Sequence, residues 1–277
     1  MKKWPLVLCA LALCCVFACK KSNSPGNPSS SNDWLSSISS YSSKSRIVDS
    51  FSYDSAHRIA RFAQYVFDST QGYPLFYGFT VDFALPAGSG SAPTSYTYKH
   101  IPAIGAADLH LLSYDGQGRI IKDASTSGSH FVTNYSYPNG NFATTVLFDG
   151  TPMNNQIDTL FMNNGNIGTE HVYFPNNAGT ADSLEGNLQF GYASTANPAY
   201  HAAIANSIGP LLFILHFDGY GGIQDVLSKN IFNKISGTDL TPSGSLNYSL
   251  SNDSKGRLSS MTTSYGGQFN TVIFKYY

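Results

Sequence analysis

Most of the chain after residue 41 alternates between apolar and polar side chains over short stretches. In the segment 187–192 every second residue is apolar, and the chain ends at 271–277 on a run of strand-forming residues. A period of two residues is typical of a strand that buries one of its faces. The pattern therefore predicts a mainly β fold, a curved antiparallel β-meander of successive hairpins.

The segment near 198–230 departs from this pattern. Tyr200–Ser207 is compatible with a helix, Gly209-Pro210 interrupts it, and Leu211–Phe217 is an apolar run. Such a run is too short to cross a bilayer as a helix. Ile223–Ser228 could add another helical turn. We expect a small helical insertion here that packs over one face or one end of the sheet.

Three segments share a pattern of Asp, two variable residues, Gly or His, Arg and an aliphatic residue. The aspartate can accept a hydrogen bond from the backbone two residues on, and glycine tolerates a positive φ, so the pattern predicts a type I turn with a bulge. His57 replaces the glycine in the first copy. Asn139-Gly140 and Asn164-Gly165 predict two further hairpins. The residues that define the three repeats are Asp54, Arg58, Asp115, Gly118, Arg119, Asp253, Gly256 and Arg257.

The first 19 residues have the layout of an export signal. Lys2 and Lys3 are followed by an apolar run over 6–17, and Ala18 then precedes Cys19. A small residue directly before a cysteine at this place resembles the bacterial lipobox, in which the thiol receives a diacylglycerol. We interpret residues 1–18 as a lipoprotein signal peptide and Cys19 as the lipidated residue; an ordinary cleaved signal is the alternative.

A polar stretch follows the proposed lipid site. Residues 20–33 are rich in Ser, Asn, Pro and Gly and have little to bury, so we interpret 19–40 as the lipidated cysteine and its tether. The remaining residues, 41–277, are expected to form a single β-rich domain. All four cysteines lie within the first 19 residues, so that domain has no disulfide and no cysteine nucleophile.

The Tyr-Asp-x-x-Gly-Arg-aliphatic unit resembles the tyrosine–aspartate repeats of Rhs-type proteins. The whole layout resembles an uncharacterised family of Bacteroidetes-type lipoproteins that combine a lipobox, a polar tether and degenerate repeats. A further likeness is Asn197-Pro198-x-Tyr200, followed later by Ser228-Lys229-Asn230. The resemblance covers 41–277 and implies fold and compartment rather than activity. It implies a protein anchored by lipid to a bacterial membrane, which we expect to be the outer membrane; the leaflet stays open.

Composition and motifs argue against several function classes. A formal net charge of −1 with 12% charged residues lacks the basic surplus of a nucleic-acid-binding protein. The seven histidines show no zinc-like spacing, and no Gly-x-Ser-x-Gly motif is present. Asp108 and His110 share one strand face, which we interpret as structural. We therefore expect no catalytic residue, metal or cofactor, and a protein that is not an enzyme.

The aromatic content, 14% of residues, carries the one hint of a ligand. Aromatic rings on a sheet can stack on sugar rings, although they can equally fill a core. We therefore expect a non-catalytic cell-envelope lipoprotein that binds a glycan. The alternatives are a structural or assembly lipoprotein whose partner is another envelope protein, and a carrier of hydrophobic cargo. The candidate ligand-binding residues are Trp34, Tyr73, Phe76, Tyr77, Tyr96 and Tyr98.

Overall fold

The computed structural model describes residues 34–42, 45–68, 77–88, 92–103, 105–126, 131–148, 151–152, 157–175, 182–204, 208–209, 211–212, 227–237, 244–265 and 268–277. Cys19, the tether up to residue 33, Tyr73 and Phe76 lie outside these ranges. Within them, no helix is both long and apolar enough to cross a membrane.

The described residues form an antiparallel sheet with very little helix. One 3-10 turn, η2 (Pro138–Gly140), and one α-helix, α2 (Pro198–Ile204), accompany the strands. The strands are β1 (Leu35–Tyr41), β2 (Ser45–Tyr53), β3 (Ile59–Asp68), β4 (Tyr77–Ala84), β5 (Ser95–Ile101), β6 (Asp108–Tyr114), β7 (Ile120–Ser125), β8 (Phe131–Ser136), β9 (Phe142–Phe148), β10 (Thr151–Pro152), β11 (Ile157–Asn163), β12 (Asn166–Pro175), β13 (Asp182–Ala196), β14 (Asn230–Gly237), β15 (Gly244–Asn247), β16 (Ser249–Asn252), β17 (Leu258–Tyr265) and β18 (Gln268–Tyr276). The predicted mainly β meander is confirmed.

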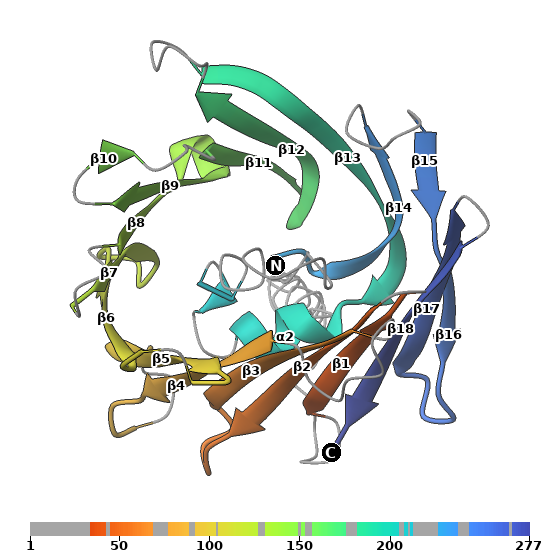
Figure 1. The fold of residues 1–277 in the computed structure, drawn as a ribbon. Coiled ribbons are helices and arrows are strands. Elements are labelled where there is room, and N and C mark those ends of the chain that lie inside the picture. The colour runs from red at the N-terminus through yellow and green to blue at the C-terminus, as the bar shows by residue number, and fades with distance from the viewer. Residues whose placement is uncertain are drawn as a thin grey trace, which may run out of the picture.

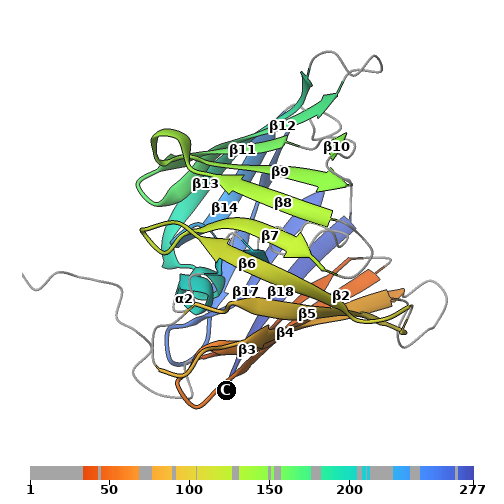
Figure 2. The same ribbon diagram turned by 90° about the vertical axis from the view of Figure 1, so that its left-hand side faces the viewer.

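Successive strands pair in chain order, and the sheet bends into a nearly closed ring (Figure 1). The first strand, β1, pairs with both β2 and β18, so the two ends of the described chain meet. The segment 244–252 contributes two short strands, of which β15 pairs with β14 and β16 pairs with β17. Figure 2 shows the strands side by side, with α2 at one end of the sheet.

The two faces of the sheet differ in character because side chains alternate along each strand. Phe51, Phe62 and Val81 lie opposite one another on β2, β3 and β4, and all three are buried. Figure 1 shows α2 inside the ring, where Ala199 and Ala202 join the same core. We call the face that carries these side chains the concave face and the opposite face the convex face.

The helical insertion begins as the sequence indicates. Pro198–Ile204 is helical, and Ile208, Leu211 and Leu212 are buried in the core. The excursion therefore occupies the concave side of the ring. The expected helical turn at 223–228 lies largely outside the described residues.

The folded region starts earlier than the expected boundary at residue 41. The strand β1 lies between β2 and β18, with Leu35 and Ile38 almost fully buried. Its serines made this stretch look like part of the tether. In the sheet Ser39 lies between Val48 of β2 and Ile273 of β18, and it is buried.

Each of the three Asp/Arg repeats forms the same hairpin turn. In the third copy, the Asp253 backbone N–H donates to the carbonyl of Arg257 at 2.8 Å, and Gly256 donates back to Asp253 at 2.9 Å with a φ of 78°. The aspartate Oδ1 accepts from the N–H groups of Lys255 and Arg257 at 2.9 Å. The Arg257 Nε donates to Oδ2 at 2.8 Å, and a register shift follows in the return strand.

The other two copies repeat these bonds around Asp54 and Asp115. Because neighbouring strands are antiparallel, the turns after β2, β6 and β16 lie at one end of the ring, which we call the turn rim. In the first copy His57 adopts a φ of 61° and stacks on Trp34 with ring centroids 5.1 Å apart. This contact accompanies a backbone conformation that favours glycine.

Candidate functional site

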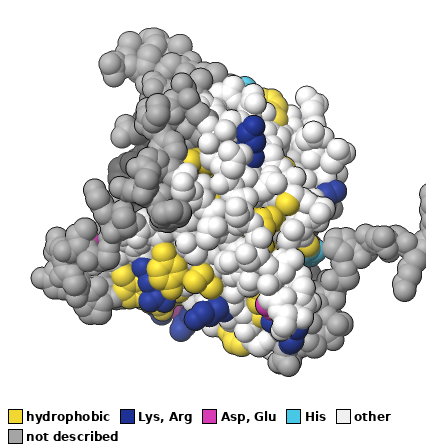
Figure 3. Space-filling view, turned by 90° about the vertical axis from the view of Figure 1, so that its right-hand side faces the viewer, with side chains coloured by type: hydrophobic (Ala, Val, Ile, Leu, Met, Phe, Trp, Pro, Cys, Tyr) yellow, Lys and Arg dark blue, Asp and Glu magenta, His cyan; other side chains and the backbone are white. Residues whose placement is uncertain are grey.

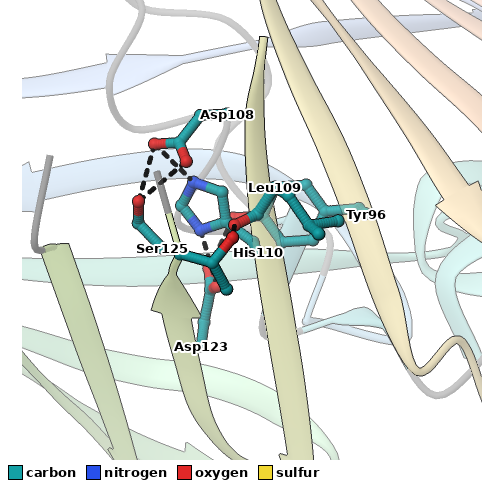
Figure 4. Close-up of polar contacts among 7 residues, drawn as sticks. Tyr96, Asp108, Leu109, His110, Asp123 and Ser125 are labelled. Carbon is teal, nitrogen blue, oxygen red and sulfur yellow. Dashed lines mark hydrogen bonds and ion pairs between the residues drawn. The ribbon is translucent and has the colours of Figure 1, made fainter. Parts of the chain in front are cut away.

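A polar cluster occupies the concave face of β5, β6 and β7 (Figure 4). Tyr96 on β5 lies opposite His110 on β6, which lies opposite Ser125 on β7. Asp108 and Asp123 sit two residues away on β6 and β7. A spacing of two residues keeps a side chain on the same face of a strand, so all five side chains converge.

Hydrogen bonds connect the whole cluster. The Tyr96 hydroxyl donates to Oδ2 of Asp123 at 2.5 Å, and it lies 2.9 Å from Nδ1 of His110. The same ring nitrogen lies 2.8 Å from Oδ1 of Asp123. On the other side of the ring, Nε2 of His110 lies 3.4 Å from Asp108, and the Ser125 hydroxyl donates to the Asp108 carboxylate at 2.7 Å.

Burial decreases across the cluster from Tyr96 to Asp108. Tyr96 is 2% exposed, whereas the side chains of His110 and Asp108 are 15% and 19% exposed. Burial of the Tyr96 ring raises the pKa of its hydroxyl well above the usual value, and the nearby Asp123 carboxylate raises it further. Tyr96 therefore stays protonated and serves as a hydrogen-bond donor, while the Asp108 side faces more open space.

An aromatic surface adjoins the cluster on β4 and β5. Tyr98 lies opposite Asp108, and its ring stacks on Phe79 with centroids 5.1 Å apart. The hydroxyl groups of Tyr77 and Tyr98 are 3.3 Å apart, and His100 packs edge-on against Tyr98 at 5.0 Å. Tyr77, Tyr98 and His100 are half-buried. Partly accessible rings and the partly accessible carboxylate of Asp108 therefore share one stretch of the concave face.

The orientation of the Ser125 hydroxyl differs from that of a serine nucleophile activated by histidine. The Ser125 hydroxyl donates to Asp108, so its proton is directed to a carboxylate and not to His110. A serine nucleophile needs a base within hydrogen-bond reach of its hydroxyl, with a third group that orients this base. Among the described residues, no group of His, Cys, Asp and Glu is arranged to hold a metal ion.

The structure brings three of the predicted aromatic residues together. Tyr77, Tyr96 and Tyr98 lie on the concave face of β4 and β5, although Tyr96 is part of the core and not an exposed platform. Trp34 lies apart from them, packed on Tyr53 and His57 at the turn rim.

Sequence reasoning missed the polar half of this site. Asp108 and His110 were placed on one strand face, but Asp123 and Ser125 were not connected with them. Asp123 and Ser125 are also two residues apart in the sequence, so they lie on one face of β7, as Asp108 and His110 do on β6. The hairpin turn predicted at Asp115–Arg119 already makes β7 the neighbour of β6, and the register that this turn sets brings Ser125 opposite His110.

A second polar cluster joins the two ends of the excursion. Asn197 is fully buried; its side chain donates to the carbonyl of Ser228 at 3.0 Å, and its backbone N–H donates to Lys229. The Ser228 hydroxyl accepts from the Ile167 backbone N–H at 2.8 Å and lies 2.9 Å from the hydroxyl of Tyr192. The two motifs that stand far apart in the sequence thus form one clasp at the base of the excursion.

Comparisons with known proteins concern the fold. No protein-family model matches the chain, and no curated protein matches it in sequence. A porin-like protein from Bacteroides uniformis is similar in structure, with 13% sequence identity, a TM-score of 0.51, and coverage of 88% of this chain and 96% of that one. A porin-like protein from Bacteroides vulgatus aligns at 10% identity with a TM-score of 0.39, covering 88% of this chain and 98% of that one. The likeness to the first protein shows a shared curved antiparallel fold.

Proposed function

We propose that this protein is a non-catalytic cell-envelope lipoprotein that binds a glycan on the concave face of β4–β7. The observation that carries the proposal is the placement of half-buried Tyr98 opposite Asp108, with the hydroxyl of half-buried Tyr77 3.3 Å from that of Tyr98. The lipid anchor at Cys19 and the outer membrane as its location belong to the same proposal.

Sugars present an apolar ring face and a rim of hydroxyl groups. A binding site for them therefore combines aromatic rings for stacking with a few well-placed polar groups that fix orientation. Tyr98 supplies a ring supported from below by Phe79, and Asp108 and Ser125 supply oxygens held in place by their own hydrogen bonds. Side chains fixed in this way lose little conformational freedom when a ligand binds.

Charged side chains on the convex face of β3, β4 and β5 are consistent with attachment through the proposed lipid. Arg61, Asp82 and Lys99 form ion pairs across the convex face of β3, β4 and β5. On the face that Figure 3 shows, most of the described surface is backbone or side chains that are neither hydrophobic nor charged, with hydrophobic patches and Lys or Arg side chains among them. Charged side chains are costly where a strand faces acyl chains.

The shared fold supports the envelope as the compartment of this chain. The similar protein from Bacteroides uniformis is described as porin-like, and the export signal ending at Cys19 agrees with an envelope location. Acylation can be tested by metabolic labelling with a palmitate analogue and by membrane fractionation. Cys19→Ala is expected to lose the label and the membrane association, and Cys14→Ala is the matched control. Equal labelling of both variants would place the lipid elsewhere.

Glycan binding is tested with the soluble domain that starts before Trp34. A thermal-shift screen against oligosaccharides identifies a ligand, since one present at a hundred times its Kd stabilises the folded state by about 2.7 kcal/mol. Titration calorimetry then compares two tyrosine variants. Tyr98→Ala is expected to weaken binding by about tenfold, which corresponds to about 1.4 kcal/mol.

The matched control is Tyr65→Ala, because Tyr65 lies on the convex face of the neighbouring strand β3. It should leave the affinity unchanged. Equal losses in both variants would show that the effect comes through stability. A folded protein that binds none of the oligosaccharides would contradict the glycan proposal.

A second candidate is a carrier of hydrophobic cargo. The specific observation is that the concave face is largely apolar, with Phe62, Phe79 and Val81 at adjacent buried positions of β3 and β4. Fatty acids belong in the same thermal-shift screen. Stabilisation by a fatty acid and by no oligosaccharide would favour this candidate over the glycan.

A further inference from the structure

In the described part of the chain, no lysine or arginine side chain lies on the concave face. Among the described residues, every lysine and arginine lies either on the convex face or at the turn rim. On the convex face these are Arg46, Arg61, Lys99, Lys122, Lys234 and Lys275; at the rim they are Arg58, Arg119, Lys229, Lys255 and Arg257. The concave face thus has no Lys or Arg side chain in the described ranges.

Carboxylates, in contrast, do occupy concave-face positions. Asp108 and Asp123 belong to the cluster described above. Asp49 is 2% exposed and accepts a hydrogen bond from Gln64 at 3.0 Å. Glu170 is 4% exposed and lies opposite the concave-face residues of β11 and β13. Four acidic groups therefore face the interior of the ring from four different strands.

This separation of charge has a physical consequence for any ligand. A curved wall with buried apolar side chains has a low dielectric constant, and such a wall concentrates the field of the charges that line it. A negative field favours a cation and disfavours an anion at the same place. The rings of Tyr77 and Tyr98 add to this preference, since the faces of aromatic rings attract ammonium groups.

A second, independent feature of the concave face also indicates a ligand. Tyr135 on β8 is 4% exposed, and its hydroxyl has no hydrogen-bond partner among the described residues. Burial raises the pKa of this hydroxyl, and the charge of Asp123 raises it further. Asp123 lies opposite Thr133 on β8, two residues from Tyr135. A buried hydroxyl without a partner costs free energy, and a ligand oxygen or amine could supply the missing hydrogen bond.

We infer that the ligand of the concave face is cationic, an oligosaccharide that carries free protonated amino groups. This inference rests on the proposed glycan binding and names the class of glycan. The hydroxyl groups of such a sugar would form hydrogen bonds with Ser125 and Tyr135. Its ring would stack on Tyr98, and its ammonium group would pair with the carboxylate of Asp108.

The experiment compares two oligosaccharides of equal length by titration calorimetry with the folded domain. One is an oligomer of glucosamine with free amines, and the other is its fully N-acetylated form. The free-amine oligomer is expected to bind at least about tenfold more tightly at low salt. Because interactions between charges are screened by ions, the difference should shrink at high salt.

Two carboxylate variants connect the effect with the site. Asp108→Asn keeps the shape of the side chain and removes its charge, so it is expected to remove most of the preference for the free amine. Asp82→Asn is the matched control, since Asp82 lies on the convex face between Arg61 and Lys99. This control should keep the preference of the unmodified domain.

The outcomes separate the charge inference from the glycan proposal. Equal affinity for both oligomers, or tighter binding of an acidic oligomer of galacturonate, would overturn the inference while glycan binding stands. Binding of spermidine that is lost in Asp108→Asn, without binding of any oligosaccharide, would support a cationic ligand and contradict the glycan. Binding of none of these probes would overturn both.

Discussion

The clasp at the base of the excursion gives the most direct test of the structure. Ser228 is fully buried, and its hydroxyl contacts the Ile167 backbone N–H at 2.8 Å and the Tyr192 hydroxyl at 2.9 Å. Ser228→Ala removes this oxygen and adds no bulk. The bond from the Asn197 side chain to the carbonyl of residue 228 remains, so the substitution isolates the hydroxyl.

The expected loss follows from the groups left without a partner. The buried N–H of Ile167 costs about 1–3 kcal/mol when it is orphaned, while the half-buried Tyr192 hydroxyl can turn toward another acceptor. We therefore expect the free energy of unfolding to fall by about 1–3 kcal/mol. For a domain of this size that corresponds to a drop in Tm of roughly 2–12 °C.

The assay is urea denaturation followed by circular dichroism. The midpoint should fall while the slope with denaturant stays unchanged, because the same surface is exposed on unfolding. Hydrogen exchange at the Ile167 amide should accelerate more than exchange in β3, which is distant from the clasp. Ser251→Ala on the convex face of β16 is the control, since Ser251 is exposed and such changes stay within about 0.5 kcal/mol.

A loss below about 0.5 kcal/mol with a cooperative transition would refute the reasoning. It would mean that the Ser228 hydroxyl does not satisfy buried groups in solution. A double-mutant cycle with Tyr192→Phe measures the remaining coupling between the two hydroxyl groups. A coupling near zero would show that the loss comes from the Ile167 amide alone.

Three further predictions concern the turns and close contacts of the sheet. The backbone N–H and the side chain of Arg119 hold the pKa of Asp115 below its usual range. The Asp115 carboxylate therefore stabilises the folded protein above about pH 4, and this stabilisation is lost as the pH falls below that value. In an acid titration, Asp115→Asn should lose less stability than the parent protein. Gly237→Ala would place a Cβ atom 2.1 Å from the backbone oxygen of Asn187. This clash should push β14 away from β13 and strongly lower Tm. Gly116→Ala is the control: its Cβ would meet nothing within 4 Å, so Tm should stay unchanged. Gly118→Ala forces an L side chain to a φ of 74° and should cost about 1 kcal/mol in a denaturation curve; no loss would show that this turn relaxes.

The resemblance to tyrosine–aspartate repeats stays a prediction, but the hydrogen bonds show why the residues of the repeat occur together. The aspartate accepts four donors in the third copy, two from backbone N–H groups and two from Arg257. Arg257 also lies over the ring of Tyr276 at 4.2 Å. Arg119 lies likewise over Tyr137 at 4.3 Å, whereas Arg58 instead donates to backbone carbonyls after β4. The same local sequence therefore finds different tertiary partners.

The sequence alone determined the local features of this protein. Alternation along a strand depends on neighbouring residues, so the β class could be predicted from the chain. Turn chemistry is equally local, which is why Asp115, Gly118 and Arg119 could be assigned to one hairpin. The helix at Pro198–Ile204 also follows from its own composition.

Only the tertiary structure decided which strands meet and which face becomes the core. The assembly of Tyr96, His110, Asp123 and Ser125 depends on register between β5, β6 and β7, and a shift of one residue would send alternate side chains to the other face. The clasp between Asn197 and Ser228 joins residues separated by the whole excursion. Such contacts depend on how several strands and the excursion pack together, which no short stretch of sequence encodes.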